Sequence, residues 1–182
     1  MWFGPRTLDL RVGLIAPTSV QMPKTSMIRP RRGRKSVLSF AIVASRYNDL
    51  YVQALVDSAT AELSEVEPGA NVHLVRVPGS FEIPLAVKLV AVQKKVDAIL
   101  ALGVVLRGET AHAELIARSV TTALMNLALE LRIPVIHEVL LLDNEEQAKA
   151  RCLGKKLNRG TEAARAAVSI ARTLSDLSLR VR

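Results

Sequence analysis

The residues that could do chemistry gather in four short segments, each of which follows an apolar run. These segments are Ser45–Asn48, Pro78–Glu82, Arg107–His112 and His137–Asn144. Each carries polar or aromatic side chains that a plain turn would not need. In open α/β sheets, ligands bind beyond the carboxyl ends of the strands, so we expect the four segments to meet at one rim of a sheet.

The third segment, Arg107-Gly-Glu-Thr-Ala-His112, holds the richest set of candidates. Gly108 lets the backbone approach a ligand closely, and the free N–H groups of a helix that starts near Thr110 favour an anion. A histidine beside a phosphate site, as His112 would be, can move protons near neutral pH. The alternative interpretation is a turn and a helix cap, in which Glu109 only complements the helix dipole.

Two aromatic residues and one acid in the other segments each allow two interpretations. Tyr47 could stack on a ring or cover the edge of the sheet, and Phe81 could face a planar ligand or join its helix to the core. Glu82 lies in the first turn of a predicted helix, where a carboxylate commonly serves the dipole. Its functional alternative is to accept hydrogen bonds from the hydroxyl groups of a ligand.

No motif for a metal or a dinucleotide cofactor is present. The three histidines, at positions 73, 112 and 137, lack zinc-ligand spacing, and there is neither a G-x-G-x-x-G nor a Walker A sequence. We therefore predict no metal and no cofactor. Cys152 is the single cysteine, so no disulfide can form within the chain, and we interpret it as inert.

The elements that must position these residues alternate along the chain. Short apolar runs predict strands over residues 37–44, 72–77, 98–105 and 134–142. Helical spacing predicts helices over residues 48–63, 81–93, 110–131, 144–153 and 161–177, the first with Asn48 as its N-cap. Alternation of this kind predicts a flavodoxin-like three-layer α/β/α sandwich around a central parallel sheet of four main strands.

Composition and charge separate a leader from one domain. Apolar residues make up 49% and aromatic residues 3% of the 182, so we expect an aliphatic core in residues 36–182. The longest apolar run, Ala98–Leu106, is shorter than the roughly 20 residues of a membrane helix, and we expect a soluble, cytoplasmic protein.

Residues 1–35 carry eight basic side chains against one acid, which leaves 17 basic and 16 acidic residues in the domain. We expect this proline-containing leader to be mostly disordered. It could be a transit peptide that targets an organelle, a basic arm for nucleic acid, or an extension without a role. The nearly neutral domain and the scarcity of aromatic residues weaken the nucleic-acid interpretation.

Five segments together resemble the 6,7-dimethyl-8-ribityllumazine synthase family over residues 37–175. They are Ser45-Arg-Tyr-Asn48, Val77-Pro-Gly-Ser-Phe-Glu-Ile-Pro84, Ala101-Leu-Gly-Val-Val-Leu-Arg-Gly-Glu-Thr-Ala-His112, Asn144-Glu-Glu-Gln-Ala148 and Asn158-Arg-Gly160. The resemblance implies condensation of 5-amino-6-(D-ribitylamino)uracil with 3,4-dihydroxy-2-butanone 4-phosphate, without a metal or redox cofactor. It also implies a homopentamer, or a sixty-subunit icosahedral shell, with active sites between subunits.

For the pyrimidine substrate, the resemblance assigns roles to one aromatic residue, one ribityl-binding segment and one strand end. Tyr47 matches the aromatic residue that stacks on the ring. The ribityl chain is contacted by the segment Ser80, Phe81 and Glu82. The uracil is held through backbone groups at the strand end formed by Val104, Val105 and Leu106.

For the phosphate substrate, Glu109 and Thr110 match the phosphate-binding turn, and His112 matches the histidine that transfers protons. Arg151 matches an arginine that reaches the phosphate from an adjacent subunit, and Lys155 matches a nearby lysine. Guanidinium geometry suits such a bidentate contact with phosphate.

The sequence departs from the family pattern at three places near this site. His137 stands where many members have phenylalanine, on the wall that a neighbouring subunit gives to the pocket. Ala113 replaces a common aromatic residue, and Leu141-Leu142 replaces a common Thr-Thr pair. These departures keep open the alternative of a non-catalytic flavin- or lumazine-binding paralogue on the same scaffold.

Overall fold

The computed structural model describes residues 37–180, so the predicted leader, residues 1–35, lies outside the described residues. The elements follow one another as β1 (Ser39–Ser45), α1 (Asp49–Val66), β2 (Asn71–Val77), η1 (Ser80–Glu82), α2 (Ile83–Gln93), β3 (Ala98–Leu106), α3 (His112–Leu131), β4 (Val135–Leu142), α4 (Glu145–Ala148), the π-helical turn η2 (Lys149–Leu153) and α5 (Arg159–Arg180). No helix in the described range is both long and apolar enough to cross a membrane.

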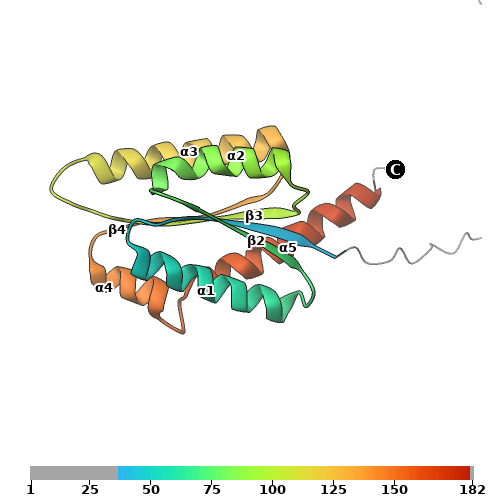
Figure 1. Cartoon of the computed structure of the whole chain (residues 1–182), viewed down its shortest axis with the longest axis horizontal. Coiled ribbons are helices and arrows are strands. Elements are labelled where there is room, and N and C mark those ends of the chain that lie inside the picture. The colour runs from blue at the N-terminus through green and yellow to red at the C-terminus, as the bar shows by residue number, and fades with distance from the viewer. Residues whose placement is uncertain (1–36, 181–182) are drawn as a thin grey trace, which may run out of the picture. The chain divides into compact units, whose positions relative to one another are not determined.

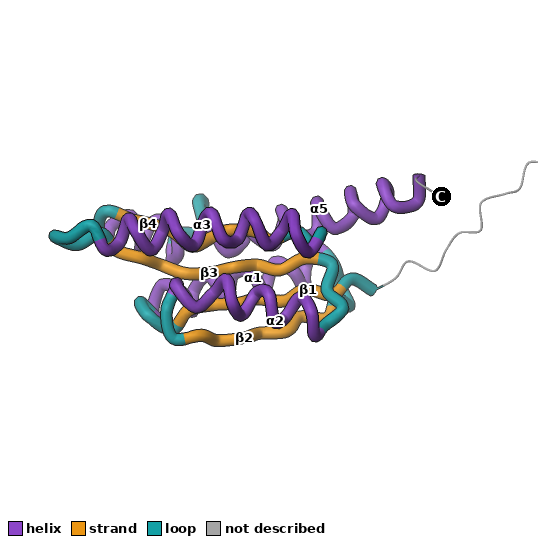
Figure 2. The backbone as a smooth tube through the Cα atoms, turned by 90° about the horizontal axis from the view of Figure 1, so that it is seen from above, coloured by secondary structure: helices purple, strands orange, loops and turns teal. Residues whose placement is uncertain are grey.

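The four strands form one sheet in the order β2-β1-β3-β4, and all neighbouring pairs are parallel. Helices α2 and α3 cover one face of the sheet, and α1, α4 and α5 cover the other (Figure 1). Figure 2 shows the same layers from above. The predicted three-layer α/β/α fold is therefore confirmed.

Two cores result from the alternation of side chains along the strands. On β1, Phe40 and Ile42 are buried toward α1 and α5, whereas Ala41 and Val43 are buried toward α2 and α3. Because both faces are covered, each central strand reads as a continuous apolar run rather than an alternating one. The few aromatic residues leave an aliphatic core, as the composition predicts.

The ends of the helices differ from the predicted ones: α1 continues to Val66, and α2 begins at Ile83, after the short helical turn η1. Helix α3 begins at His112 rather than at Thr110, because residues 109–111 form a turn in front of it. Helix α5 begins at Arg159 rather than at residue 161, because the Oδ1 atom of Asn158 accepts hydrogen bonds from the N–H groups of Gly160 (2.9 Å) and Thr161 (3.2 Å). The helix predicted over residues 144–153 is α4 continued by the π-helical turn η2.

Candidate active site

The parallel sheet brings the loops after all four strands to one rim. Ser45, at the end of β1, lies opposite Val77, at the end of β2, and Leu106, at the end of β3, lies opposite Leu142, at the end of β4. Because Ala44 pairs with Leu102, β3 and β4 extend about three residues beyond β1 and β2 at the same edge of the sheet. Backbone hydrogen bonds connect the loops: the Tyr47 N–H donates to the carbonyl of Pro78 (3.1 Å), and the Arg107 N–H donates to that of Leu142 (2.8 Å). The predicted convergence of the segments that follow the strands is thus confirmed.

Asn48 occupies the N-cap position of α1, as predicted, but its side chain does not cap the helix. It stands before α1 in the left-handed region, at φ 58°, and its side chain makes no capping hydrogen bond. Instead its Nδ2 atom donates to the carbonyl of Val104 at 2.9 Å. This bond fastens the loop that carries Tyr47 to the end of β3. Asparagine tolerates left-handed backbone well, which is the one local signal that could have indicated this arrangement.

The strand end assigned to the uracil is divided by the same contact. Val104 is buried and its carbonyl is occupied by Asn48. Val105 and Leu106 are half-buried and lie nearer the rim. Both residues pair with β4, but β1 ends before them, so their edge on the β1 side has no neighbouring strand.

Tyr47 and Phe81 are exposed aromatic residues on adjacent loops of the rim. Tyr47 is 73% exposed and Phe81 is 63% exposed, so neither serves the core. This exposure argues against the interpretation in which Phe81 joins its helix to the core. The ligand-facing role of the two rings stays a prediction.

The segment after β2, Pro78–Glu82, is held in place by contacts of Ser80 and Glu82. Ser80 is buried against β3, where a Cβ atom on Gly103 would lie 2.7 Å from the Ser80 Oγ atom, so a side chain at position 103 would displace Ser80. One carboxylate oxygen of Glu82 accepts from the Gly79 N–H at 2.8 Å, which gives Glu82 its structural role. Its other oxygen makes no hydrogen bond with residues 37–177 and remains available to a ligand hydroxyl group.

The turn after β3 presents Glu109, Thr110 and His112 as exposed side chains beside the N-terminus of α3. Arg107 is engaged in ion pairs within the chain. Its Nε atom donates to Asp143 Oδ1 at 2.8 Å, and its Nη1 atom pairs with Glu114. Arg107 therefore holds the turn to α3 and to the loop after β4. A Cβ atom on Gly108 would meet nothing within 4 Å, so the turn's backbone stays open to an anion.

Arg151 and Lys155 are exposed on the other side of the sheet. They lie in and just after η2, which packs against α1, whereas His112 begins α3 on the opposite face (Figure 1). Within one chain the structure therefore does not bring Arg151 and Lys155 together with His112.

His137 is also apart from the rim. Its Nε2 atom lies 2.9 Å from the Oγ1 atom of Thr121, whose hydroxyl donates to the carbonyl of Ala117 at 2.7 Å. Thr121 is nine residues beyond His112 on α3, a rise of about 13 Å. His137 is thus placed on the edge strand β4, away from this chain's rim.

Cys152 is a buried thiol without a catalytic neighbour. Burial, reinforced by the charge of Glu138, raises the pKa of its thiol to about 11. Within residues 37–177, no three His, Cys, Asp or Glu side chains gather as metal ligands would. The geometry agrees with the interpretation of Cys152 as an inert side chain.

This burial predicts slow alkylation of Cys152 by iodoacetamide at pH 8 in the folded protein and fast alkylation in urea. The rate should rise with pH toward a midpoint near 11. Because the unfolded thiol ionises near its ordinary value of 9.0, the free energy of unfolding should fall as the pH rises above that value. Mass spectrometry of the alkylated protein provides the measurement, and rapid reaction of the folded protein at pH 8 would contradict it.

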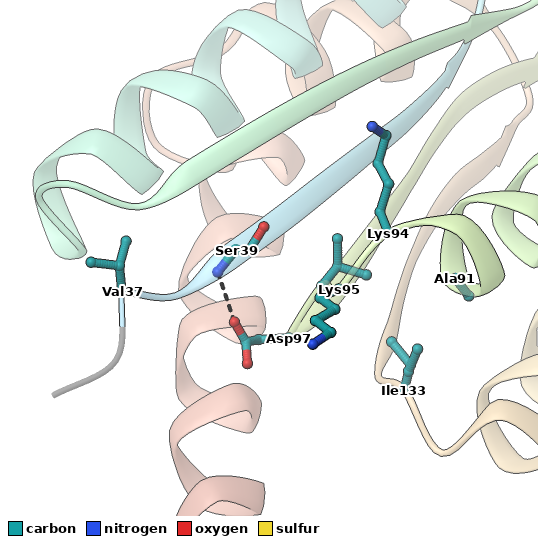
Figure 3. A pocket seen from close by; sticks show the side chains of 8 residues that line it. Val37, Ser39, Ala91, Lys94, Lys95, Asp97 and Ile133 are labelled. Carbon is teal, nitrogen blue, oxygen red and sulfur yellow. Dashed lines mark hydrogen bonds between the residues drawn. The ribbon is translucent and has the colours of Figure 1, made fainter. Parts of the chain in front are cut away.

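A cavity of about 440 Å³ lies at the opposite end of the sheet (Figure 3). Its lining includes Ser39 at the start of β1, Lys94 and Lys95 after α2, and Asp97, whose carboxylate accepts from the Ser39 N–H at 2.7 Å. Parallel α/β sheets place ligands at the carboxyl ends of the strands, not here. The candidate active site is therefore the rim.

The structure defines a flavodoxin-like α/β/α protein whose rim carries two exposed aromatic rings and the N-terminus of helix α3. The 6,7-dimethyl-8-ribityllumazine synthase family model matches residues 37–175, the whole sheet and most of the helices. The chain belongs to this family.

Three curated relatives bear the name 6,7-dimethyl-8-ribityllumazine synthase. The protein of Aquifex aeolicus is 43% identical over 143 residues, which cover 77% of this chain and 92% of that one. The protein of Polaromonas sp. is 37% identical over 147 residues, covering 80% and 92% of the two chains. The protein of Pyrococcus furiosus is 43% identical over 134 residues, covering 74% and 83%.

Proposed function

We propose that this chain is a transferase that condenses 5-amino-6-(D-ribitylamino)uracil with 3,4-dihydroxy-2-butanone 4-phosphate to give the lumazine, phosphate and water, the penultimate step of riboflavin biosynthesis. The family match over residues 37–175 carries this proposal, because it spans every loop of the rim. Each of the relatives above is named for the synthase, which favours the enzyme over a non-catalytic flavin- or lumazine-binding paralogue.

For the pyrimidine substrate, we assign ring stacking to Tyr47 and the ribityl chain to Ser80, Phe81 and Glu82. The exposed rings of Tyr47 and Phe81 and the free oxygen of Glu82 support these roles. The backbone of Val105 and Leu106 would hold the uracil, with Val104 buried behind them.

For the phosphate substrate, we assign the phosphate to the turn of Glu109 and Thr110, where backbone N–H groups and the helix dipole of α3 favour an anion. His112, at the first residue of α3, would move protons during imine formation, phosphate elimination and ring closure. The remaining acceleration would come from holding two substrates in a reactive orientation, which needs no covalent nucleophile.

We further propose a homopentamer whose active sites are shared between neighbouring subunits. Helix α2 exposes an apolar stripe of Leu85, Leu89 and Val92, and the outer face of α3 exposes Met125 and Leu129. Such a surface is typical of a subunit interface. The separation of Arg151 from His112 within one chain also supports a site completed by a second subunit, with His137 on the neighbour's wall.

Charges placed in these stripes should dissociate the assembly. The double substitution of Leu85→Glu and Leu129→Glu would bury like charges at the interface, and we expect loss of both the oligomer and the activity. Analytical ultracentrifugation measures the assembly, and it separates a pentamer from a sixty-subunit shell. Leu177→Glu, an exposed leucine on α5, is the control. A fully active pentamer of the double variant would contradict the proposed interface.

The reaction itself is tested by mixing purified protein with both substrates and following lumazine formation by absorbance against a protein-free control. Saturable acceleration supports the synthase. A folded oligomer that binds riboflavin tightly without turnover would favour the paralogue. The domain boundary near residue 36 and a cytoplasmic location stay predictions from the sequence.

A further inference from the structure

The most buried acidic side chain in residues 37–177 belongs to Glu138, in the middle of the edge strand β4. Glu138 is 5% exposed and faces α5. Both of its oxygens accept hydrogen bonds from Arg159, Oε2 from Nε at 2.9 Å and Oε1 from Nη2 at 2.8 Å. Arg159 also pairs with Glu162 one turn further along α5.

The Glu138–Arg159 ion pair is expected to add little to the free energy of unfolding. Burial raises the pKa of Glu138, although the hydrogen bonds and the charge of Arg159 act in the opposite direction. The Glu138 side chain is 7% exposed and that of Arg159 is 35% exposed, so the carboxylate carries most of the desolvation cost. Such a cost commonly cancels much of the attraction between two charges, and a well-packed apolar pair can stabilise a fold as well. A bidentate pair fixes the orientation of α5 relative to β4, which an apolar pair does not do.

Asn158 connects the start of α5 to the turn that carries Arg151. Asn158 immediately precedes Arg159, and its Nδ2 atom donates to the carbonyl of Cys152 at 2.7 Å. Cys152 is fully buried and adjoins Arg151 in η2. Gly154, which ends this turn, has no room for a side chain, since a Cβ atom would lie 2.4 Å from the Ala150 carbonyl oxygen. The π-helical turn therefore has little freedom apart from the start of α5.

We propose that Glu138 and Arg159 are positioning residues that set the direction of Arg151 toward the phosphate of the substrate. The inference rests on the proposed role of Arg151 in the synthase reaction. Arg159 anchors the first turn of α5 to β4, Asn158 anchors η2 to that turn, and Arg151 projects from η2. A shift of α5 against β4 would move the guanidinium of Arg151, and small misplacements of a phosphate-binding group cost affinity.

The test separates positioning from stability. Glu138→Gln and Arg159→Met remove the ion pair, Arg159→Lys keeps the charge without the fork, and Glu138→Leu with Arg159→Leu replaces the pair by apolar groups. Arg165→Met is the matched control, because Arg165 on the same helix pairs with Glu62 of α1 (2.6 Å) away from η2. For each full-length variant, KM is measured for both substrates, the binding of inorganic phosphate by calorimetry, and Tm by thermal unfolding.

We expect Glu138→Gln and Arg159→Met to raise KM for the phosphate substrate and weaken phosphate binding by about tenfold, with little change for the pyrimidine substrate. Arg159→Lys should recover part of this loss. The double leucine variant should regain Tm without regaining phosphate affinity, and Arg165→Met should change Tm alone.

A double leucine variant with wild-type phosphate affinity would overturn the inference, because the pair would then be purely structural. Equal losses for both substrates would overturn it as well. A wild-type protein without turnover would instead overturn the proposed function. The phosphate-binding measurements would still decide whether Glu138 and Arg159 position Arg151, because calorimetry does not depend on turnover.

Discussion

Replacement of His112 by alanine is expected to lower turnover by about 10²–10⁴-fold, the contribution of one positioned acid–base group. His112 opens α3, beside the turn of Glu109 and Thr110, and its side chain is exposed to the rim. There it can give and take protons while the imine forms and the phosphate leaves. The measurement is the initial rate of lumazine formation, corrected for the uncatalysed condensation.

The control for this variant is His73→Ala. His73 lies in the middle of β2, paired with Ala41 and away from the rim, so its loss should leave turnover unchanged. The substrate KM values should change little in the His112 variant, because the group acts chiefly in the transition state. An unchanged rate with alanine at position 112 would remove His112 from its assigned role.

Arg151→Ala is expected to raise KM for the phosphate substrate by about 10–100-fold. A charge-assisted hydrogen bond to a guanidinium contributes about 1.5–3 kcal/mol, which corresponds to that range. KM for the pyrimidine substrate should remain close to its original value. Lys149→Ala, which removes a cation of the same turn that pairs with Glu145 (3.7 Å), is the control. Unaltered dependence on the phosphate substrate would refute the assignment.

The two variants together test whether sites are shared between subunits. A shared site takes His112 from one subunit and Arg151 from its neighbour. In an oligomer mixed from the two variants, a site is intact where an Arg151→Ala subunit supplies His112 and the adjacent His112→Ala subunit supplies Arg151. Random mixing in equal amounts should restore about one site in four. Mixing after unfolding and refolding should therefore recover activity that neither variant has alone. No recovery from well-formed mixed oligomers would contradict a shared site.

The fold could be predicted from local patterns because each element leaves one in the sequence. Runs such as Ala98–Leu106 indicate strands buried on both faces, and the change to helical spacing marks the crossovers that make the sheet parallel. Parallel strands then require the loops after them to meet, which is why the rim was predictable. The starts of the helices were less predictable. Helix α3 begins at His112 because the turn before it, not the apolar spacing, decides where helical hydrogen bonds start.

The sequence by itself determined the class of fold, the rim and the residue types on it, since periodicity and turn chemistry are properties of neighbouring residues. Only the tertiary structure decided which partners the polar side chains choose. Asn48 bonds Val104, Arg107 bonds Asp143, and Glu138 bonds Arg159, in each case across 21 or more positions of the chain. Such pairs depend on how whole elements pack, and a sequence window carries no information on the direction of a long side chain. The proposed role of Glu138 follows from its burial and its contact with Arg159, which only the structure shows.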